Sequence, residues 1–87
     1  MRHIRNETEL GVAIRERREN AQLTQAQLAE RANVSRAFLS ELERGKRPRA
    51  ELSRVFSVLR ALETAIVLEE HKTLTTDEAL AKLLGIS

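Results

Sequence analysis

The feature that most constrains this chain is a stretch of twenty residues that favours two short helices joined by a tight turn. Residues 25–32 and 36–44 are rich in helix-forming side chains, and each run follows a good helix-capping residue, Thr24 or Ser35. The asparagine and valine at 33–34 favour a turn between the runs. Small or apolar side chains recur at a spacing that lets both helices close on one core. They are Leu28, Ala29, Ala32, Val34, Leu39 and Leu42.

The second of these helices has a polar outer face and is followed by a basic run. Gly45 is suited to end the helix in a left-handed conformation, and Pro48 prevents it from continuing. The outward positions are Arg36, Ala37, Ser40 and Glu41. Two helices packed across a short turn, with a polar face on the second, fit the DNA major groove. The pattern therefore predicts a protein that reads DNA.

This segment resembles the Cro/C1-type helix-turn-helix family, the lambda-repressor-like (XRE family) domains of phage repressors and bacterial regulators. The resemblance spans residues 10–62 and rests on several motifs at fixed offsets. These motifs are Leu23-Thr24-Gln25, Leu28-Ala29, Val34-Ser35 and Leu42-Glu43-Arg44-Gly45-Lys46. The resemblance implies a mainly α fold, a helix-turn-helix bundle of four to five helices. The alternative is a small helical bundle of another kind.

The resemblance also implies roles for individual residues. By position, the residues expected to contact DNA bases are Ser35, Arg36, Ala37 and Ser40. The residues expected to contact DNA phosphates are Gln25, Arg44, Lys46, Arg47 and Arg49. Arg36 suits guanine, because a guanidinium can donate two hydrogen bonds to O6 and N7. Glu41 has two open roles, accepting a hydrogen bond from cytosine N4 or pairing with Arg44 on the helix surface.

Three further side chains have a structural and an alternative interpretation. In the resembling family an arginine of the first helix often pairs with the glutamate near the end of the recognition helix. This implies an ion pair between Arg18 and Glu43; otherwise Arg18 is one more surface charge. Phe56 is expected in the core. Phe38 is either a core residue or a contact to a thymine methyl group.

Two more helices flank the central pair. Asn6 and Glu9 have the offset of a capping box, so a helix is expected from there to about Asn20. Its inward residues would be Leu10, Ala13 and Ile14. After the basic run, apolar residues at helical spacing predict a fourth helix over about 50–62. Its inward residues would be Leu52, Val55, Phe56 and Leu59.

Residues 64–69 change the pattern, because they are short, rich in β-branched side chains and bounded by charges, which predicts a strand. A lone strand cannot satisfy its own backbone groups. The simplest partner is the same segment of a second subunit, paired antiparallel across a two-fold axis. The dimerisation residues would be Ala65, Ile66, Val67 and Leu68. Two alternatives remain: pairing with residues 3–5 of the same chain, and continuation of the fourth helix through Leu68.

A helix-turn-helix unit followed by such a strand resembles HipB-type antitoxins, over about residues 4–70. This resemblance implies a homodimeric repressor of a palindromic operator whose C-terminal strands pair between subunits. It also implies a HipA-like serine/threonine kinase toxin as a partner. The expected division is a DNA-binding domain (1–62), a dimerisation strand (63–70) and a C-terminal tail (71–87).

The tail is predicted to hold one short helix. Thr75 and Glu78 have the offset of a capping box, and Gly85-Ile86 has the pattern of a helix end with its hydrophobic contact. The apolar stripe between them is Leu80, Leu83 and Leu84. Because so short a helix is unstable alone in water, it is expected to dock on its own dimer or on a partner protein.

Charge divides the chain in the same way. Residues 1–60 carry thirteen Lys or Arg and eight Asp or Glu, a net charge of +5, whereas residues 61–87 carry two and five, a net charge of −3. A basic first part suits contact with phosphates, and an acidic last part suits another role.

Several classes of protein are excluded by what the sequence lacks. Without cysteine there is no disulfide or thiolate metal site. His3 and His71 lie far apart in the sequence and are expected to be exposed and incidental, so neither a metal nor a cofactor is predicted. No nucleophile–base pair or phosphate-binding glycine loop indicates an enzyme, so no catalytic residue is predicted. Neither a signal peptide nor a membrane span is indicated, which favours a cytoplasmic protein. The family resemblance implies a bacterial protein associated with the nucleoid.

Other functions remain open at this point. Among DNA-binding proteins, the alternatives to an antitoxin are a phage-type repressor and a restriction-modification controller protein. Outside that class, the alternative is a protein-interaction module that does not read DNA.

Overall fold

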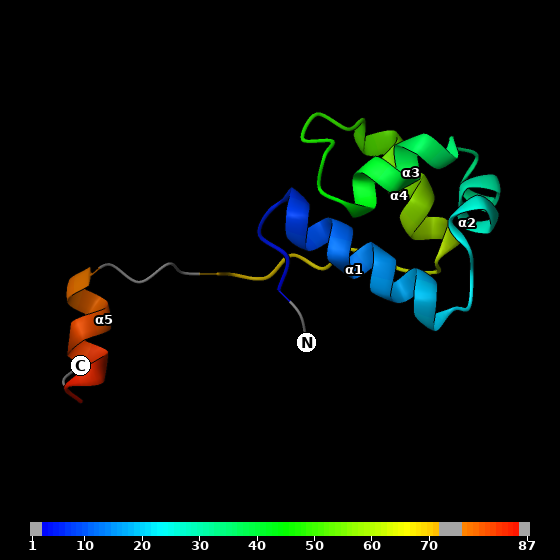
Figure 1. The fold of residues 1–87 in the computed structure, drawn as a ribbon. Coiled ribbons are helices and arrows are strands. Elements are labelled where there is room, and N and C mark those ends of the chain that lie inside the picture. Colours follow the sequence, from blue (N-terminus) through cyan, green and yellow to red (C-terminus); the bar gives the residue numbers. More distant parts are fainter. Residues whose placement is uncertain (1–2, 72–75, 86–87) are drawn as a thin grey trace.

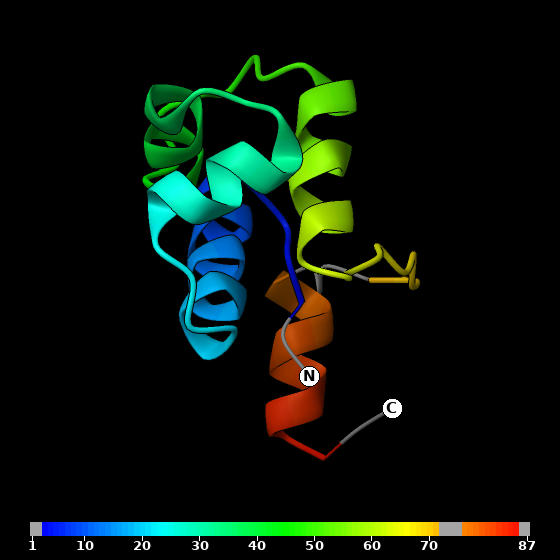
Figure 2. The same ribbon diagram turned by 90° about the vertical axis from the view of Figure 1, so that its right-hand side faces the viewer.

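The computed structural model describes residues 3–71 and 76–85, and within them the fold is all-α (Figure 1). The helices are α1 (Glu7–Asn20), α2 (Gln25–Ala32), α3 (Arg36–Glu43), α4 (Leu52–Ala61) and α5 (Thr76–Leu83). In the bundle, α3 packs on α1, and α2 packs on both α3 and α4 (Figures 1 and 2). The predicted bundle of four to five helices is confirmed in these residues.

The first three helices begin at the residues predicted from their caps. Thr24 Oγ1 accepts a hydrogen bond from Gln27 N at 3.1 Å, and Gln27 Oε1 accepts one from Thr24 N at 2.9 Å. This reciprocal capping box satisfies two backbone donors at the start of α2. Ser35 Oγ accepts from Phe38 N at 3.0 Å at the start of α3. At the start of α1, Asn6 Oδ1 accepts a hydrogen bond from Glu9 N at 2.9 Å.

The turn between α2 and α3 depends on Asn33, which has a φ of 57°. In that left-handed conformation its backbone N donates to Glu30 O at 3.1 Å, and Val34 N donates to Ala29 O at 3.0 Å. These two bonds satisfy the last carbonyls of α2, as a glycine would at this position. Asparagine tolerates the left-handed region better than most residues, which explains why a tight turn forms here without glycine.

The core is formed by apolar side chains from α1 to α4. Its buried members are Ile14, Leu28, Ala29, Ala32, Phe38, Leu39, Leu42, Val55, Val58 and Leu59. Leu10 and Val34 are half-buried and pack against this cluster. The core residues predicted around the turn are therefore confirmed. The closed bundle holds α3 so that only one of its faces meets solvent.

The inward face of α4 differs from the predicted one. Val55 and Leu59 are buried as expected, but Leu52 is 70% exposed and Phe56 is 39% exposed. Val58 takes the inward position instead and has no exposed surface. Leu52 and Phe56 have helical spacing, but the buried stripe of α4 is formed by Val55, Val58 and Leu59. The expectation that Leu52 and Phe56 belong to the core was therefore wrong.

Helix α4 ends sharply after Ala61. Glu63 has a φ of 53°, and its backbone N donates to Arg60 O at 2.9 Å. Thr64 N donates to Leu59 O at 2.9 Å, which closes the helix end. The alternative in which this helix continues through Leu68 is therefore wrong.

Residues 64–70 form neither helix nor strand in the described chain. The segment leads from the end of α4 toward α5 in Figure 1, and Leu68 is 93% exposed. No ladder forms with residues 3–5, so the predicted strand is not present in this single chain. The physical reason is that a strand needs a neighbour for its backbone groups, and no segment of one described chain supplies it.

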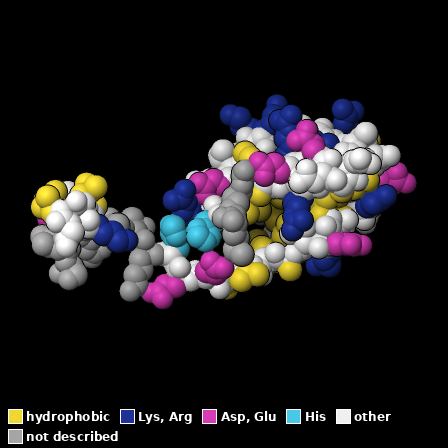
Figure 3. Space-filling view, turned by 90° about the horizontal axis from the view of Figure 1, so that it is seen from below, with side chains coloured by type: hydrophobic (Ala, Val, Ile, Leu, Met, Phe, Trp, Pro, Cys, Tyr) yellow, Lys and Arg dark blue, Asp and Glu magenta, His cyan; other side chains and the backbone are white. Residues whose placement is uncertain are grey.

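A side chain that precedes α1 nevertheless contacts side chains of the segment that follows α4. His3 Nε2 lies 3.2 Å from Glu69 Oε2, and the rings of His3 and His71 have centroids 5.7 Å apart (Figure 3). Both histidines are exposed, as predicted. Their proximity was not predicted, because 68 positions separate them in the sequence.

Helix α5 lies apart from the bundle (Figure 1). Its apolar stripe of Leu80, Leu83 and Leu84 is exposed. Thr75 of the predicted capping box and Ile86 of the predicted helix end lie outside the described residues. No helix in the described ranges has the length and apolar character needed to cross a membrane.

Candidate nucleic-acid interface

One face of α3 carries the residues predicted to contact DNA bases. Ser35, Arg36 and Ala37 are exposed, and Ser40 is half-buried. The opposite face is buried and holds Phe38, Leu39, Leu42 and Glu43. The helix thus presents a short polar strip supported by a packed core.

Small or polar side chains dominate this strip around one arginine. Ser35 Oγ accepts the capping hydrogen bond from the backbone, which leaves its hydroxyl hydrogen free to be donated. In the described part of the chain no carboxylate pairs with Arg36. Its guanidinium is therefore available for an outside acceptor.

A hydrogen-bonded network fixes the end of α3 to the two preceding helices. Arg18 donates through Nε to Glu43 Oε2 at 2.7 Å and through Nη2 to Glu43 Oε1 at 3.0 Å. Its Nη1 donates to Leu23 O at 2.8 Å. Gln25 Nε2 also donates to Glu43 Oε1, at 3.1 Å. The structure thus forms the ion pair implied by the family resemblance.

Because this network is buried, its main effect is on the relative orientation of the helices. Glu43 is only 6% exposed and is the one buried charged residue in the described chain. The hydrogen bond to Glu43 raises the pKa of Arg18 above its ordinary value, although burial acts in the opposite direction. A bidentate pair of this kind restricts the relative orientation of α1 and α3 more than it adds net stability.

Gln25, predicted to contact phosphate, is the first residue of α2. Its amide nitrogen is held by Glu43, which fixes the side chain at the positive end of that helix. A phosphate contact here stays a prediction.

A basic loop, residues 44–49, follows α3 and depends on Gly45, which has a φ of 68°. Gly45 N donates to Leu42 O at 3.1 Å, and Lys46 N donates to Glu41 O at 2.9 Å. A Cβ at Gly45 would lie 2.9 Å from the Thr8 Cα, so both conformation and space require glycine. Arg44, Lys46 and Arg49 are exposed on this loop.

Arg47 behaves differently from the other basic residues of this loop. Its Nε donates to Glu41 Oε2 at 2.9 Å, and its guanidinium lies over the Phe38 ring, 5.0 Å from the centroid. The helix-surface pair expected between Glu41 and Arg44 was therefore wrong: Arg44 Nε instead approaches Ser40 O at 3.4 Å. Helical spacing rules did not predict the Glu41–Arg47 pair, because they concern residues three or four positions apart and these two are six apart.

Phe38 is only 1% exposed and is a core residue. Contact with a thymine methyl group, the alternative considered from the sequence, is excluded by this burial. A second guanidinium, that of Arg54 in α4, lies 5.8 Å from the same ring centroid. Arg54 was not singled out from the sequence, because its contact with Phe38 joins two different helices.

Gly11 is a second residue whose role was missed. It is buried in α1, and a Cβ there would lie against Leu42 O and 2.6 Å from Glu43 O. Glycine thus lets α1 approach the backbone at the end of α3. A glycine inside a helix disfavours that helix, and this was the available signal of close packing.

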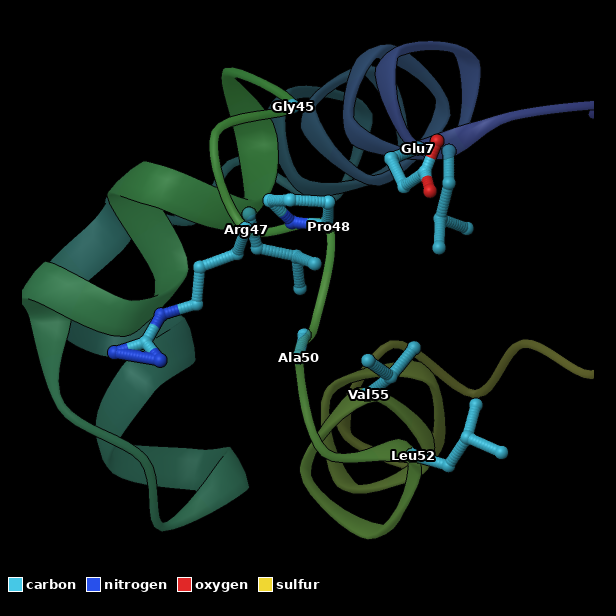
Figure 4. Close-up of a pocket in the computed structure, with 9 residues that line it drawn as sticks. Glu7, Gly45, Arg47, Pro48, Ala50, Leu52 and Val55 are labelled. Atoms are coloured by element: carbon cyan, nitrogen blue, oxygen red, sulfur yellow. The ribbon is translucent and has the colours of Figure 1, made fainter.

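A small apolar pocket of about 140 Å³ lies between the start of α1, the basic loop and the start of α4 (Figure 4). Seven of its lining residues are labelled there: Glu7, Gly45, Arg47, Pro48, Ala50, Leu52 and Val55. Small-molecule sites usually exceed about 300 Å³. In the described residues no group of three or more potential side-chain ligands is arranged to hold a metal ion.

Charged side chains of both signs surround the bundle. Figure 3 shows one group of Lys and Arg along the upper edge, further Lys, Arg and carboxylates spread over the bundle, and the two histidines on the side nearest α5. In the described part of the chain neither Lys46 nor Arg49 pairs with a carboxylate. These cations, on the loop that follows α3, form a surface suited to a polyanion.

The chain is similar to known proteins in sequence and in fold. The model of the helix-turn-helix domain family matches residues 9–71. A structure of HipB with an O4 20mer is 26% identical, with a TM-score of 0.75 over 83% of this chain and 100% of that one. HipB(S29A) with an O2 20mer is 28% identical, with a TM-score of 0.76 over 83% of this chain and 99% of the other.

A HipA–HipB–O2–O3 complex contains a chain that is 27% identical, with a TM-score of 0.73 over 83% of this chain and 100% of that one. None of the curated proteins shows a significant sequence match. The family match covers α2, α3, α4 and all but the first two residues of α1. The chain therefore belongs to the helix-turn-helix domain family of DNA-binding proteins, and its fold is similar to that of HipB.

Proposed function

We propose that this protein is a sequence-specific transcriptional repressor that binds a palindromic DNA operator as a homodimer. The observation that carries the proposal is the exposed strip on α3, where Arg36 has no carboxylate partner among the described residues. The loop that follows α3 carries the exposed cations Lys46 and Arg49, which also have no carboxylate partner among the described residues. A major-groove helix flanked by phosphate-binding cations needs this combination.

The proposal divides the interface into two sets of residues. Base contacts come from Ser35, Arg36, Ala37 and Ser40. Phosphate contacts come from Gln25, Arg44, Lys46 and Arg49. Arg47, the fifth residue predicted for this role, is engaged by Glu41. Arg36 recognises guanine through two hydrogen bonds, and Ala37 permits close approach to the base edges. The phosphate contacts set affinity and register, and the base contacts choose the sequence.

The dimer would form through residues 64–69 of two chains. Ile66, Val67 and Leu68 are all exposed in the single chain, and the backbone around them belongs to neither a helix nor a strand. Antiparallel pairing with a second copy would satisfy these backbone groups and cover the apolar side chains. Two recognition helices related by a two-fold axis would then face successive turns of the DNA.

We further propose that the protein is the antitoxin of a HipBA-type module. The similarity to HipB covers 83% of the chain, and one of the similar structures is a complex that includes HipA. The partner would accordingly be a HipA-like serine/threonine kinase. The chain would restrain it by binding, and the complex would repress its own operon.

The DNA-binding proposal is tested by selecting bound sequences from a random duplex library and footprinting the result. The expected site is a palindrome whose half-site centres lie about 34 Å apart, one helical turn. Protection of a single unrepeated half-site would remove the dimer from the proposal. Binding that showed no preference over random DNA would remove the repressor function itself.

A further inference from the structure

Arg47 is the one residue of the basic loop whose guanidinium is already engaged on two sides. Its Nε is 2.9 Å from Glu41 Oε2, and its carbon Cζ lies 5.0 Å from the centroid of the Phe38 ring. Both partners belong to α3, the helix proposed to read DNA. Neighbouring Lys46 and Arg49 have no carboxylate partner in the described chain.

We infer that Arg47 is a positioning residue: it fastens the basic loop to the recognition helix and does not bind phosphate. This inference rests on the proposed function, because it assigns a role within the same interface. The Arg47 clamp is defined here as the Arg47 guanidinium with the Glu41 carboxylate and the Phe38 ring.

The geometry of the clamp uses properties that are specific to arginine. The planar guanidinium can donate from Nε at its edge while its face stacks on an aromatic ring. Phe38 is buried in the core, so its ring offers a surface held by packing for that face. The contact thereby fixes the position of the basic loop, which carries Lys46 and Arg49, relative to α3.

The clamp also determines what Glu41 can do. A bare carboxylate on the outer face of α3 would repel the DNA backbone or accept a hydrogen bond from cytosine N4. Pairing with Arg47 neutralises the charge and occupies one carboxylate oxygen. Glu41 therefore supports the loop and does not contribute to base preference.

Salt-dependent binding distinguishes a clamp from a phosphate contact. The double variant Glu41→Gln/Arg47→Gln leaves the net charge of the protein unchanged. If Arg47 touches no phosphate, the slope of log K against log salt stays at the wild-type value. A lost phosphate contact lowers the magnitude of this slope by about one unit. The matched control, Glu30→Gln/Lys46→Gln, has the same net charge, keeps Glu41 beside Arg47, and should lose that unit.

The affinity of the Glu41→Gln/Arg47→Gln variant should fall by roughly threefold to tenfold, since an exposed ion pair and a cation–π contact each contribute about fivefold at most. Arg47→Lys tests the same point with a conservative change. Lysine serves well as a point charge for phosphate but cannot stack a planar group. If Arg47 is a clamp, Arg47→Lys should show most of the affinity loss of the Glu41→Gln/Arg47→Gln variant. If Arg47 binds phosphate, Arg47→Lys should lose almost no affinity.

A measurement without DNA keeps the inference separate from the proposed function. In thermal unfolding, Glu41→Gln and Arg47→Gln should be coupled, so that the double variant loses no more in Tm than the worse single variant. Wild-type protein that ignores DNA while showing this coupling would overturn the function and retain the clamp. Two results would overturn the clamp. One is a reduced salt slope for the Glu41→Gln/Arg47→Gln variant. The other is wild-type DNA affinity of Arg47→Lys together with additive Tm losses from Glu41→Gln and Arg47→Gln.

Discussion

The Arg18 guanidinium in α1 donates to both carboxylate oxygens of Glu43 in α3, at 2.7 and 3.0 Å. The same carboxylate accepts from Gln25 at the start of α2. One buried side chain thus connects all three helices of the DNA-reading unit. The arrangement predicts that this pair controls the orientation of the recognition helix.

Removing one member of the pair should be costly. Glu43→Ala leaves the Arg18 cation half-buried without its partner, so we expect a loss of about 3 kcal/mol in the free energy of unfolding. Arg18→Met/Glu43→Leu removes both charges and should lose less than Glu43→Ala, because no isolated charge remains. Urea denaturation of both variants gives the comparison. A double variant at least as unstable as Glu43→Ala would show that the charges themselves stabilise the bundle.

Gly11→Ala should destabilise the bundle even though alanine is the better helix former. The added Cβ would meet the carbonyl oxygens of Leu42 and Glu43, which cannot move away without shifting α3. We expect a loss of about 1–3 kcal/mol, typical of overpacking. Arg17→Ala is the control, because it places an alanine at an exposed position of the same helix. Gly11→Ala would have to be as stable as wild type in denaturant titrations to contradict the observed packing.

Arg36 and Lys46 should affect DNA binding in different ways. Arg36→Ala should cost on the order of 1–3 kcal/mol at the cognate site and relax the preference at one base position. Lys46→Ala should weaken binding to every sequence and reduce the salt slope by roughly one unit. Fluorescence anisotropy with cognate and random duplexes at several salt concentrations measures both effects. Identical behaviour of the two variants would refute the division into base and phosphate contacts.

The dimer should depend on backbone pairing around Val67. Val67→Pro removes a backbone donor and cannot be accommodated inside a paired strand, so sedimentation should show monomers with much weaker operator binding. Val67→Ala is the control, because it shortens the side chain but keeps the N–H. A Val67→Pro protein that stayed dimeric would move the interface elsewhere, with the exposed Phe56 face of α4 as the first place to look.

The proposed antitoxin role predicts a physical partner. The full chain should co-purify with the product of the neighbouring gene, and that gene expressed alone should inhibit growth. The complex should bind the operator at least as tightly as the dimer alone, so that repression depends on the ratio of the two proteins. A harmless neighbour that never co-purifies would leave a repressor without a toxin.

Local chemistry in the sequence determined the DNA-reading unit. Capping by Thr24 and Ser35, the turn at Asn33 and the helix end at Gly45 each depend on residues within a few positions of one another. The same short range explains why the outward face of α3 could be predicted from helical spacing. Patterns of this kind survive folding because the groups that interact are already neighbours in the chain.

Only the tertiary structure decided which of several possible contacts forms. Val58 is buried and Phe56 exposed, because the helices opposite α4 select one of two adjoining apolar stripes. Glu41 pairs with Arg47 because the turn at Gly45 folds the basic loop back onto α3. Helix α4 ends at a left-handed Glu63, and the strand predicted after it has no partner in the described chain. The choice of the α4 stripe depends on groups distant in sequence, and the strand would need a second molecule. The Glu41–Arg47 pair and the end of α4 join near neighbours, but each depends on a turn in the backbone that helical and strand spacing do not describe.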